Sequence, residues 1–289
     1  MNEKKLKERL KDVKRLLGKD EGELAFVGVA NVAEYRWCAQ KSVFSNREME
    51  LAYFEAFLYD VVYYAEELGY IRGADRVVES ITAEELMELR DKITLDDVNY
   101  LLKKREEAKR KLPFSMIEIP HGFLNREEAA ELLGALAPSP RVFEIIRKLP
   151  PDIQGEILHQ IFTEKYATIR WNFPWREYIV AAIPDGITDS YVYEFKATVY
   201  PGAVKYVALA QADIYGYFFK RPEKLVQLLH RRGYQLETFR GPVDAEYALE
   251  TLEKFRAVEK GLKEPEPPKE WKCKSCEYRQ ICPIYAKRS

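Results

Sequence analysis

The sequence has no long apolar run and little histidine or cysteine. No 18 consecutive apolar residues occur among its 289 residues, which excludes an ordinary transmembrane helix. It holds 3 His and 4 Cys, and its 46 Lys and Arg nearly balance its 47 Asp and Glu, which excludes a uniformly basic nucleic-acid binder. Residues 1–19 are charged throughout and lack the apolar core of a secretory signal. We therefore expect a soluble, cytoplasmic protein with no membrane partner.

The composition is that of a folded domain. Hydrophobic residues make up 47% and aromatic residues 13%, which excludes global disorder. Charged residues reach 32%, while Asn and Gln together number 13, a combination that favours a thermophilic source. The length allows one large domain or a core with a smaller appendage.

The first half of the chain has the pattern of helices. Apolar spacing predicts a helix over residues 3–18, and an apolar segment follows at 24–33. We expect a long helix from Ser45 or Asn46 to Tyr70. Four further helices are predicted from their N-cap residues, namely Thr82, Thr94, Asn125 and Ser139.

The second half alternates helices and strands, which predicts an α/β core. The predicted helices cover 152–166, 203–219 and 244–261, and the predicted strands cover 168–173, 178–183, 191–198, 226–229 (ambiguous with a helix) and 234–239. The expected segments are an N-terminal helix with the first cysteine, a helical insertion, the core and a cysteine-rich end, at 1–44, 45–150, 151–262 and 263–289.

The cysteines are unevenly placed. Cys38 stands alone, whereas Cys273, Cys276 and Cys282 form a C-x2-C-x5-C segment after a proline-rich linker. In an intracellular chain, close cysteines favour a metal over disulfides. Structural zinc sites usually pair their ligands locally, whereas here one ligand is remote and the metal would join the two ends of the chain. An iron–sulfur cluster is favoured, with zinc or reduced thiols as the alternatives.

The segment from Pro184 to Lys196 carries the chemistry. Asp185 ends one predicted strand, and Glu194 and Lys196 lie two apart on the next, so the latter two project from one face. Two carboxylates and a lysine suit hydrolysis of a phosphodiester assisted by Mg²⁺ or Mn²⁺. The alternative is an ordinary surface hairpin with a Glu–Lys pair.

Two neighbouring helices carry residues that fit the same surface. His159, before the hairpin, is a candidate third metal ligand. Gln211 and Tyr215, after it, are four apart and share a helix face, so Gln211 is a candidate for positioning the lysine or water and Tyr215 for contacting DNA. Each of these signals taken alone is more typical of packing.

The set taken in order resembles the PD-(D/E)XK nuclease superfamily in its RecB-like branch with a C-terminal iron–sulfur cluster. The order is a cysteine, a histidine, an aspartate, E-x-K, Q-x-x-x-Y and C-x2-C-x5-C, and all of it is present. The resemblance covers roughly half of the chain and is greatest to the CRISPR-associated exonucleases of the adaptation module. No Walker A sequence is present, so the helicase-fused relatives are not expected.

The resemblance implies a restriction-endonuclease-like core with a mixed sheet flanked by helices. It implies a 4Fe–4S cluster on the four cysteines and Mg²⁺ or Mn²⁺ held by His159, Asp185, Glu194 and the backbone carbonyl of Phe195. It implies exonuclease action on single-stranded DNA or overhangs before spacer integration, with the CRISPR integrase complex as a partner. The alternatives are a non-catalytic DNA-binding or assembly subunit and a general DNA-repair nuclease.

Three features depart from the family pattern. Asp189 is an alternative motif acid because Gly186 to Asp189 fits the G-x-x-D form, although we prefer Asp185. The residues after Cys38 are Ala-Gln-Lys rather than Pro-Arg. The helical insertion is long for the compact members.

Two basic segments are candidates for contacting DNA. They are the N-terminal helix and the residues from Lys260 onward, both expected near the cysteines. Trp37 and Trp271 are candidate stacking platforms for a single strand.

Overall fold

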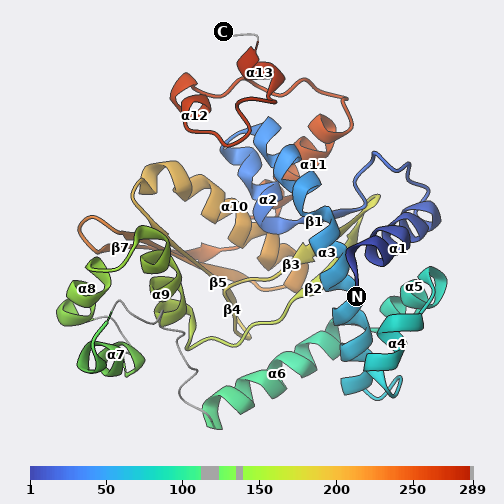
Figure 1. Ribbon diagram of the computed structural model, residues 1–289, viewed down its shortest axis with the longest axis horizontal. Helices are drawn as coiled ribbons and strands as arrows, with labels where there is room; N and C mark the ends of the chain where they lie inside the picture. The colour runs from blue at the N-terminus through green and yellow to red at the C-terminus, as the bar shows by residue number, and fades with distance from the viewer. Residues whose placement is uncertain (112–123, 135–138, 287–289) are drawn as a thin grey trace.

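The protein is a mixed α/β structure with two sheets, described here by a computed structural model over residues 1–111, 124–134 and 139–286 (Figure 1). Parts of the expected insertion (112–123 and 135–138) and of the cysteine-rich end (287–289) lie outside the described residues. Within the described part, no helix combines the length and apolar character needed to cross a membrane.

The two sheets differ in size and pairing. The smaller has the order β1-β3-β2, with β1 parallel and β2 antiparallel to β3. The larger has the order β4-β5-β6-β7, in which β5 and β6 are parallel and both edge strands are antiparallel to their neighbours. The strands are β1 (Phe26–Gly28), β2 (Trp171–Trp175), β3 (Tyr178–Ala182), β4 (Gly186–Ile187), β5 (Tyr191–Thr198), β6 (Glu223–His230) and β7 (Gln235–Pro242).

Helices cover both faces of the larger sheet because the side chains of β5 alternate between two apolar cores. Val192 packs in the core that contains α10, whereas Tyr193 and Phe195 pack in the core that contains α9. Figure 1 shows these two helices on opposite sides of the sheet. The helices of this half are α9 (Pro151–Thr163), α10 (Pro201–Phe219), α11 (Ala245–Glu259), α12 (Glu270–Lys274) and α13 (Pro283–Ala286).

The strand predictions hold in part. The strand predicted at 191–198 matches β5, and the ambiguous 226–229 segment is the centre of strand β6. The strand predicted at 168–173 begins at Trp171 instead. The expected turn after Asp185 contains the two-residue strand β4, which pairs with β5.

The first half is helical, as expected, and the predicted caps form. Thr82 and Asn125 each make a capping box, and Thr94 and Ser139 accept hydrogen bonds from the first turns of their helices. The elements are α1 (Glu3–Leu16), α2 (Val29–Ala33), η1 (Glu34–Arg36), α3 (Ala39–Glu67), α4 (Ala74–Ser80), α5 (Ala83–Lys92), α6 (Leu95–Lys111), α7 (Arg126–Leu133) and α8 (Pro140–Arg147).

The expected start of the long helix at Ser45 or Asn46 is wrong. Helix α3 begins at Ala39, with Cys38 as its N-cap, and residue 45 lies inside it. Asn46 is fully buried, and its side chain accepts a hydrogen bond from the Gly28 N–H (2.9 Å) and donates one to the Ser42 carbonyl (2.8 Å). Its amide therefore joins α3 to the smaller sheet instead of capping a helix, a tertiary role that the local pattern does not reveal.

Candidate functional site

The β4–β5 pairing brings Asp185 beside the E-x-K residues. Gly186 pairs with Tyr193, so the residue before β4 lies next to Glu194 and Phe195. The Asp185 Oδ2 atom accepts a hydrogen bond from the Phe195 N–H at 2.7 Å. The backbone of β5 therefore fixes this carboxylate at the edge of the candidate site.

His159 reaches the same carboxylate from α9. Its Nε2 atom lies 2.9 Å from Asp185 Oδ1. The imidazole is 47% exposed, whereas the Asp185 side chain is 15% exposed, so the histidine forms the outer side of the pair. The sequence prediction that these two residues meet is matched by this contact.

Glu194 is buried without normal hydrogen-bonding partners. Its side chain is 0% exposed, and among the described residues neither carboxylate oxygen has a partner of hydrogen-bonding geometry. Burial, followed by the nearby Asp185 carboxylate, raises the pKa of Glu194 to about 8. A buried carboxyl of this kind is costly unless a cation or a proton compensates for it. The residue is therefore not part of an ordinary surface hairpin.

Lys196 supplies the nearest compensating charge. Its Nζ atom lies 2.5 Å from Glu194 Oε1, and its side chain is 32% exposed. Burial by itself would lower the pKa of Lys196, but the Glu194 and Asp185 carboxylates raise it. The Lys196 ammonium group therefore contacts the buried Glu194 carboxyl, while part of the lysine side chain is exposed to solvent.

Gln211 and Tyr215 lie on the α10 face that covers β5. The Gln211 Nε2 atom donates to the Tyr215 hydroxyl at 3.1 Å. Burial, and then the neighbouring Glu194, raise the pKa of Tyr215 well above its ordinary value. Its side chain is 1% exposed, so the expected contact of Tyr215 with DNA does not fit this structure. The tyrosine instead holds the amide of Gln211.

Asp189, the alternative motif acid, lies elsewhere. It is an exposed residue of the turn between β4 and β5. The residues around it bond to one another, since Tyr191 N–H donates to the Thr188 hydroxyl at 3.0 Å. The contacts with Phe195 and His159 belong to Asp185 instead.

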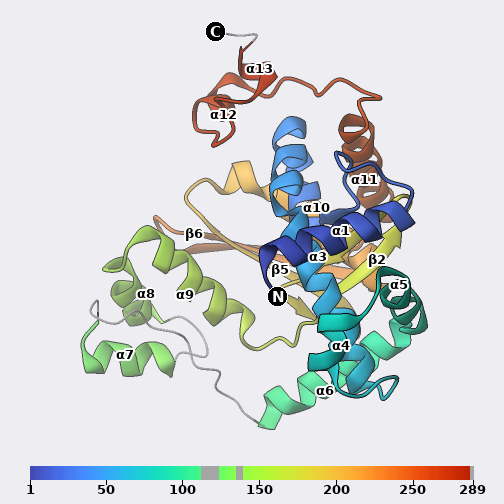
Figure 2. The same cartoon turned by 45° about the vertical axis from the view of Figure 1, so that its right-hand side comes forward.

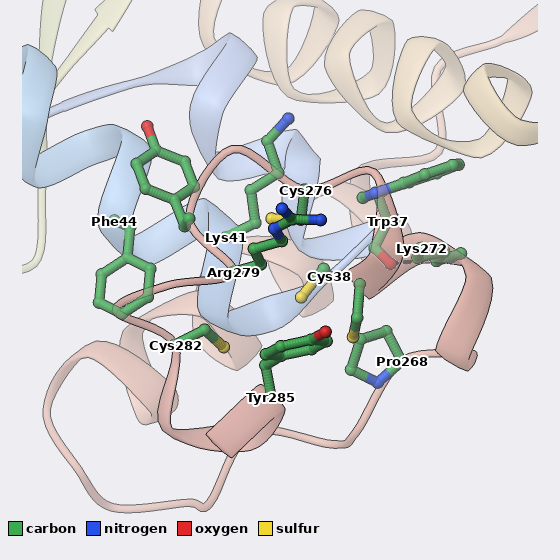
Figure 3. Close-up of a pocket in the computed structure, with 12 residues that line it drawn as sticks. Trp37, Cys38, Lys41, Phe44, Pro268, Lys272, Cys276, Arg279, Cys282 and Tyr285 are labelled. Carbon is green, nitrogen blue, oxygen red and sulfur yellow. Dashed lines mark hydrogen bonds between the residues drawn. The ribbon is translucent and has the colours of Figure 1, made fainter. Parts of the chain in front are cut away.

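The four cysteines line one cavity, although 235 positions separate the first two. Figure 3 shows it with Cys38, Cys276 and Cys282 around Arg279 and Tyr285. Cys273, which is buried, completes the set. The sequence prediction that the remote cysteine joins the C-terminal three is thus matched by their shared cavity.

The cysteine cavity contains four thiols, which is the ligand type of structural zinc sites and of iron–sulfur clusters. Burial raises the pKa of both Cys38 and Cys276. Thiols that share a partly buried cavity would gain from a cation that stabilises their thiolate forms. In the described residues, no three His, Cys, Asp or Glu side chains converge closely enough to hold a metal ion as they stand. This holds for the cysteine cavity and for the Asp185 region alike.

A cleft of about 380 Å³ connects the two regions. Lys196 and Gln211 line one side, and residues of the cysteine segment line the other. Four residues line both the cleft and the cysteine cavity, namely Trp37, Lys41, Lys272 and Cys276. The cysteine segment is therefore a wall of the cleft that reaches the E-x-K lysine.

The sequence reasoning missed three charged residues of this cleft. Lys41 bridges Glu34 and Glu277, with 3.1 Å from its Nζ atom to each carboxylate. Lys41 and Glu277 closely follow Cys38 and Cys276, and this proximity was the available signal. Their charge alone does not separate them from solvated surface residues.

Helix α1 and the two tryptophans were predicted to contact DNA near the cysteines. Helix α1 packs against α3 and α5, and Figures 1 and 2 show it apart from α12 and α13, so its expected place near the cysteines is wrong. Lys5 and Lys14 of α1 already pair with Glu79 and Glu50. Trp37 and Trp271 contact each other edge to face, with ring centroids 5.1 Å apart, and their role as stacking platforms for a strand stays a prediction.

Comparisons with known proteins do not assign this chain to a family. No known family model and no curated protein matches the chain. A solved structure described as "Crystal structure of SSO0001" is similar, with 17% sequence identity and a TM-score of 0.36 over 65% of this chain and 96% of that chain. A likeness at this level assigns neither a family nor a function.

Proposed function

We propose that the chain is a divalent-metal-dependent DNA exonuclease of the PD-(D/E)XK kind, in its RecB-like branch. The observation that carries the proposal is the meeting of an E-x-K strand with an aspartate, a helical histidine and a helical glutamine. These side chains come from α9, the β3–β4 connection, β5 and α10. Such a meeting of separately unremarkable residues is hard to account for by packing, since Glu194 is buried at a cost.

Asp185, Glu194, His159 and the main-chain carbonyl of Phe195 would hold Mg²⁺ or Mn²⁺. Apart from the Lys196 ion pair, the buried carboxylate of Glu194 has no partner of hydrogen-bonding geometry among the described residues, and this is the observation that fits a hard cation. Such an ion, when bound, activates a water and neutralises charge on a phosphodiester. Glu194 gives up its proton on binding a cation, so the affinity rises with pH up to about 8, the pKa of the metal-free residue.

The remaining residues act on the phosphate and the water. The Lys196 ammonium donates to an oxygen on which negative charge develops in the transition state. Gln211, held by the Tyr215 hydroxyl, orients the water or Lys196 through its amide. Glu194 and Tyr215 are themselves buried, so the electrostatic contacts of these two side chains are stronger than they would be in water.

The four cysteines would hold a 4Fe–4S cluster, which is our assignment for their cavity. It would tie Cys38, at the start of α3, to the C-terminal segment and so keep one wall of the cleft in place. We expect an anaerobic preparation to absorb near 400 nm and to contain about four irons per chain. Cys38→Ser should lose that absorption. A colourless wild-type protein holding one zinc would refute the cluster and leave the nuclease assignment standing.

The proposed setting is the trimming of DNA ends before CRISPR spacer integration, in the cytoplasm and with the integrase complex as partner. It rests on the resemblance alone. A general role in DNA repair uses the same chemistry, and pull-down of the integrase by this chain separates the two.

End-labelled single-stranded DNA tests the activity directly. With Mg²⁺ or Mn²⁺, the wild-type protein should shorten it, and Glu194→Gln should lower the rate by about 100-fold or more, as for removal of a principal electrostatic group. Glu237→Gln is the matched control, because Glu237 lies on edge strand β7 and pairs with His230. Equal rates for wild type and Glu194→Gln would refute the proposal.

A non-catalytic DNA-binding subunit is the second candidate. It is favoured by the direct His159–Asp185 contact and by the lack of three converging metal ligands in the described residues. Salt-sensitive DNA binding without cleavage in either metal would support it.

A further inference from the structure

The cleft between Lys196 and the cysteine segment contains a lysine held by two carboxylates. Lys41, in the first turn of α3, lies 3.1 Å from Glu34 of η1 and 3.1 Å from Glu277, which follows Cys276. All three line the cleft. The Lys41–Glu277 pair thus crosses from the N-terminal region to the C-terminal wall.

The two carboxylates are not equivalent. The Glu34 side chain is 27% exposed and also accepts a hydrogen bond from the Ser45 hydroxyl at 2.9 Å, so it is fixed from two sides. The Glu277 side chain is 59% exposed, so it can turn into water at little cost. Of the two, Glu277 is the one that an incoming anion can replace.

A second cation lines the same cleft from the cysteine segment. Lys272 donates to the Trp37 carbonyl at 2.8 Å, and its Nζ atom lies 4.3 Å from the centroid of the Trp37 ring. No carboxylate pairs with it in the described structure within ion-pair distance. The cleft therefore offers two ammonium groups: that of Lys272, which has no carboxylate partner among the described residues, and that of Lys41, which is held by an exchangeable carboxylate.

We propose that Lys41 and Lys272 bind successive phosphates of a single DNA strand, and that Glu277 occupies at Lys41 the position that a phosphate takes when the strand enters. The inference rests on the proposed nuclease function. Exchange of a carboxylate for a phosphate leaves the charge around Lys41 nearly unchanged, so Lys41 is paired with an anion at this position both before and after the strand binds. Glu277 competes with anions for Lys41 and so weakens nonspecific binding of anions at this position. A DNA strand that also contacts Lys272 displaces it.

Fluorescence anisotropy of labelled single-stranded DNA in EDTA tests this without cleavage. Glu277→Gln should bind about twofold to fivefold more tightly than wild type, as expected for loss of a competing exposed ion pair. Lys41→Gln and Lys272→Gln should each bind more weakly and lower the slope of log K against log salt by about 0.7 between about 50 and 200 mM salt. The gain in Glu277→Gln is decisive, because a disturbed fold would weaken binding instead.

The matched control is Glu3→Gln, which removes another exposed, ion-paired carboxylate (72% exposed, paired with Lys7 on α1) away from the cleft. It should bind as wild type does. Unchanged or weaker binding by Glu277→Gln, with wild-type binding and cleavage intact, would overturn this inference alone. A wild-type protein that neither binds nor cleaves the strand would overturn the proposed function as well.

Discussion

Glu194 should reduce the stability of the metal-free protein, and Glu194→Gln should relieve that cost. The residue is 0% exposed, and burial together with Asp185 raises its pKa from 4.5 to about 8. Between these two values the folded protein binds the extra proton, so the free energy of unfolding falls as the pH rises from 4.5 to 8. A glutamine has no proton to lose and removes that dependence.

The size of the effect follows from the same values. A pH of 7 is about 2.5 units above the ordinary pKa of 4.5, so the carboxyl of Glu194 is ionised in the unfolded protein. In the folded protein, where its pKa is about 8, it is still mostly protonated. At 1.36 kcal/mol per pKa unit, ionisation of Glu194 stabilises the unfolded state by about 3 kcal/mol relative to the folded state at pH 7. The Glu194→Gln variant lacks this contribution, so its free energy of unfolding should be higher by about 3 kcal/mol. For a chain of this size we expect a rise in Tm of about 5–10 °C in EDTA. Lys196 keeps Asp185 as a counter-charge in the variant.

Thermal melts in EDTA and in Mn²⁺, at pH 6, 7 and 8, check this reasoning. The wild-type protein should gain stability from Mn²⁺, by about 2.7 kcal/mol at 100 times its Kd, and Glu194→Gln should gain none. Asp189→Asn, in the exposed turn, is the control and should keep the metal response. A Glu194→Gln variant that melts below wild type in EDTA, or that keeps the Mn²⁺ shift, would refute the argument.

Three further substitutions test the packing. Lys19 is 8% exposed, and its Nζ atom has no hydrogen-bonding partner in the part of the chain that the structure describes. Burial and then Lys260 lower the pKa of Lys19 from 10.5 to about 8, so the free energy of unfolding should rise as the pH rises from 8 to 10.5. Lys19→Met should abolish that rise and stabilise the protein at pH 7 by about 1–3 kcal/mol; a denaturant titration with no gain would contradict this. In Gly186→Ala the new Cβ would lie 2.4 Å from Tyr166 Cβ, so urea melts should show a loss of about 1–3 kcal/mol. In Gly155→Ala, in α9, the new Cβ would meet no described atom within 4 Å outside the neighbouring helix backbone, so the variant should gain about 0.5–1 kcal/mol in the free energy of unfolding, and a loss would contradict this expectation.

The sequence pattern predicted those elements whose signals are local. Thr82 and Asn125 begin helices as expected because a capping residue and a glutamate three positions later suffice to specify a helix start. The alternation of residues 191–198 predicted β5 for a similar reason. The start of α3 was missed because Asn46 bonds to Gly28, which is 18 positions away.

The candidate site divides in the same way. The order of the motifs along the sequence predicted that Asp185 and Glu194 belong to one site. The pairing of β4 with β5 places these two residues next to each other. The roles of Lys41 and Glu277 depend on the cysteine segment folding back over α3, a contact across 236 positions. Side-chain burial was equally hidden, since a Q-x-x-x-Y spacing does not tell that Tyr215 is enclosed.

The most direct test of the proposed nuclease compares Asp185→Asn with Asp189→Asn in single-turnover cleavage of end-labelled single-stranded DNA with Mg²⁺ or Mn²⁺. Asp185 contacts His159 and the Phe195 N–H, whereas Asp189 lies in the exposed turn. We predict that Asp185→Asn loses about 100-fold or more in rate, while Asp189→Asn cleaves as wild type does. Equal rates for Asp185→Asn and wild type, or a loss confined to Asp189→Asn, would contradict the account.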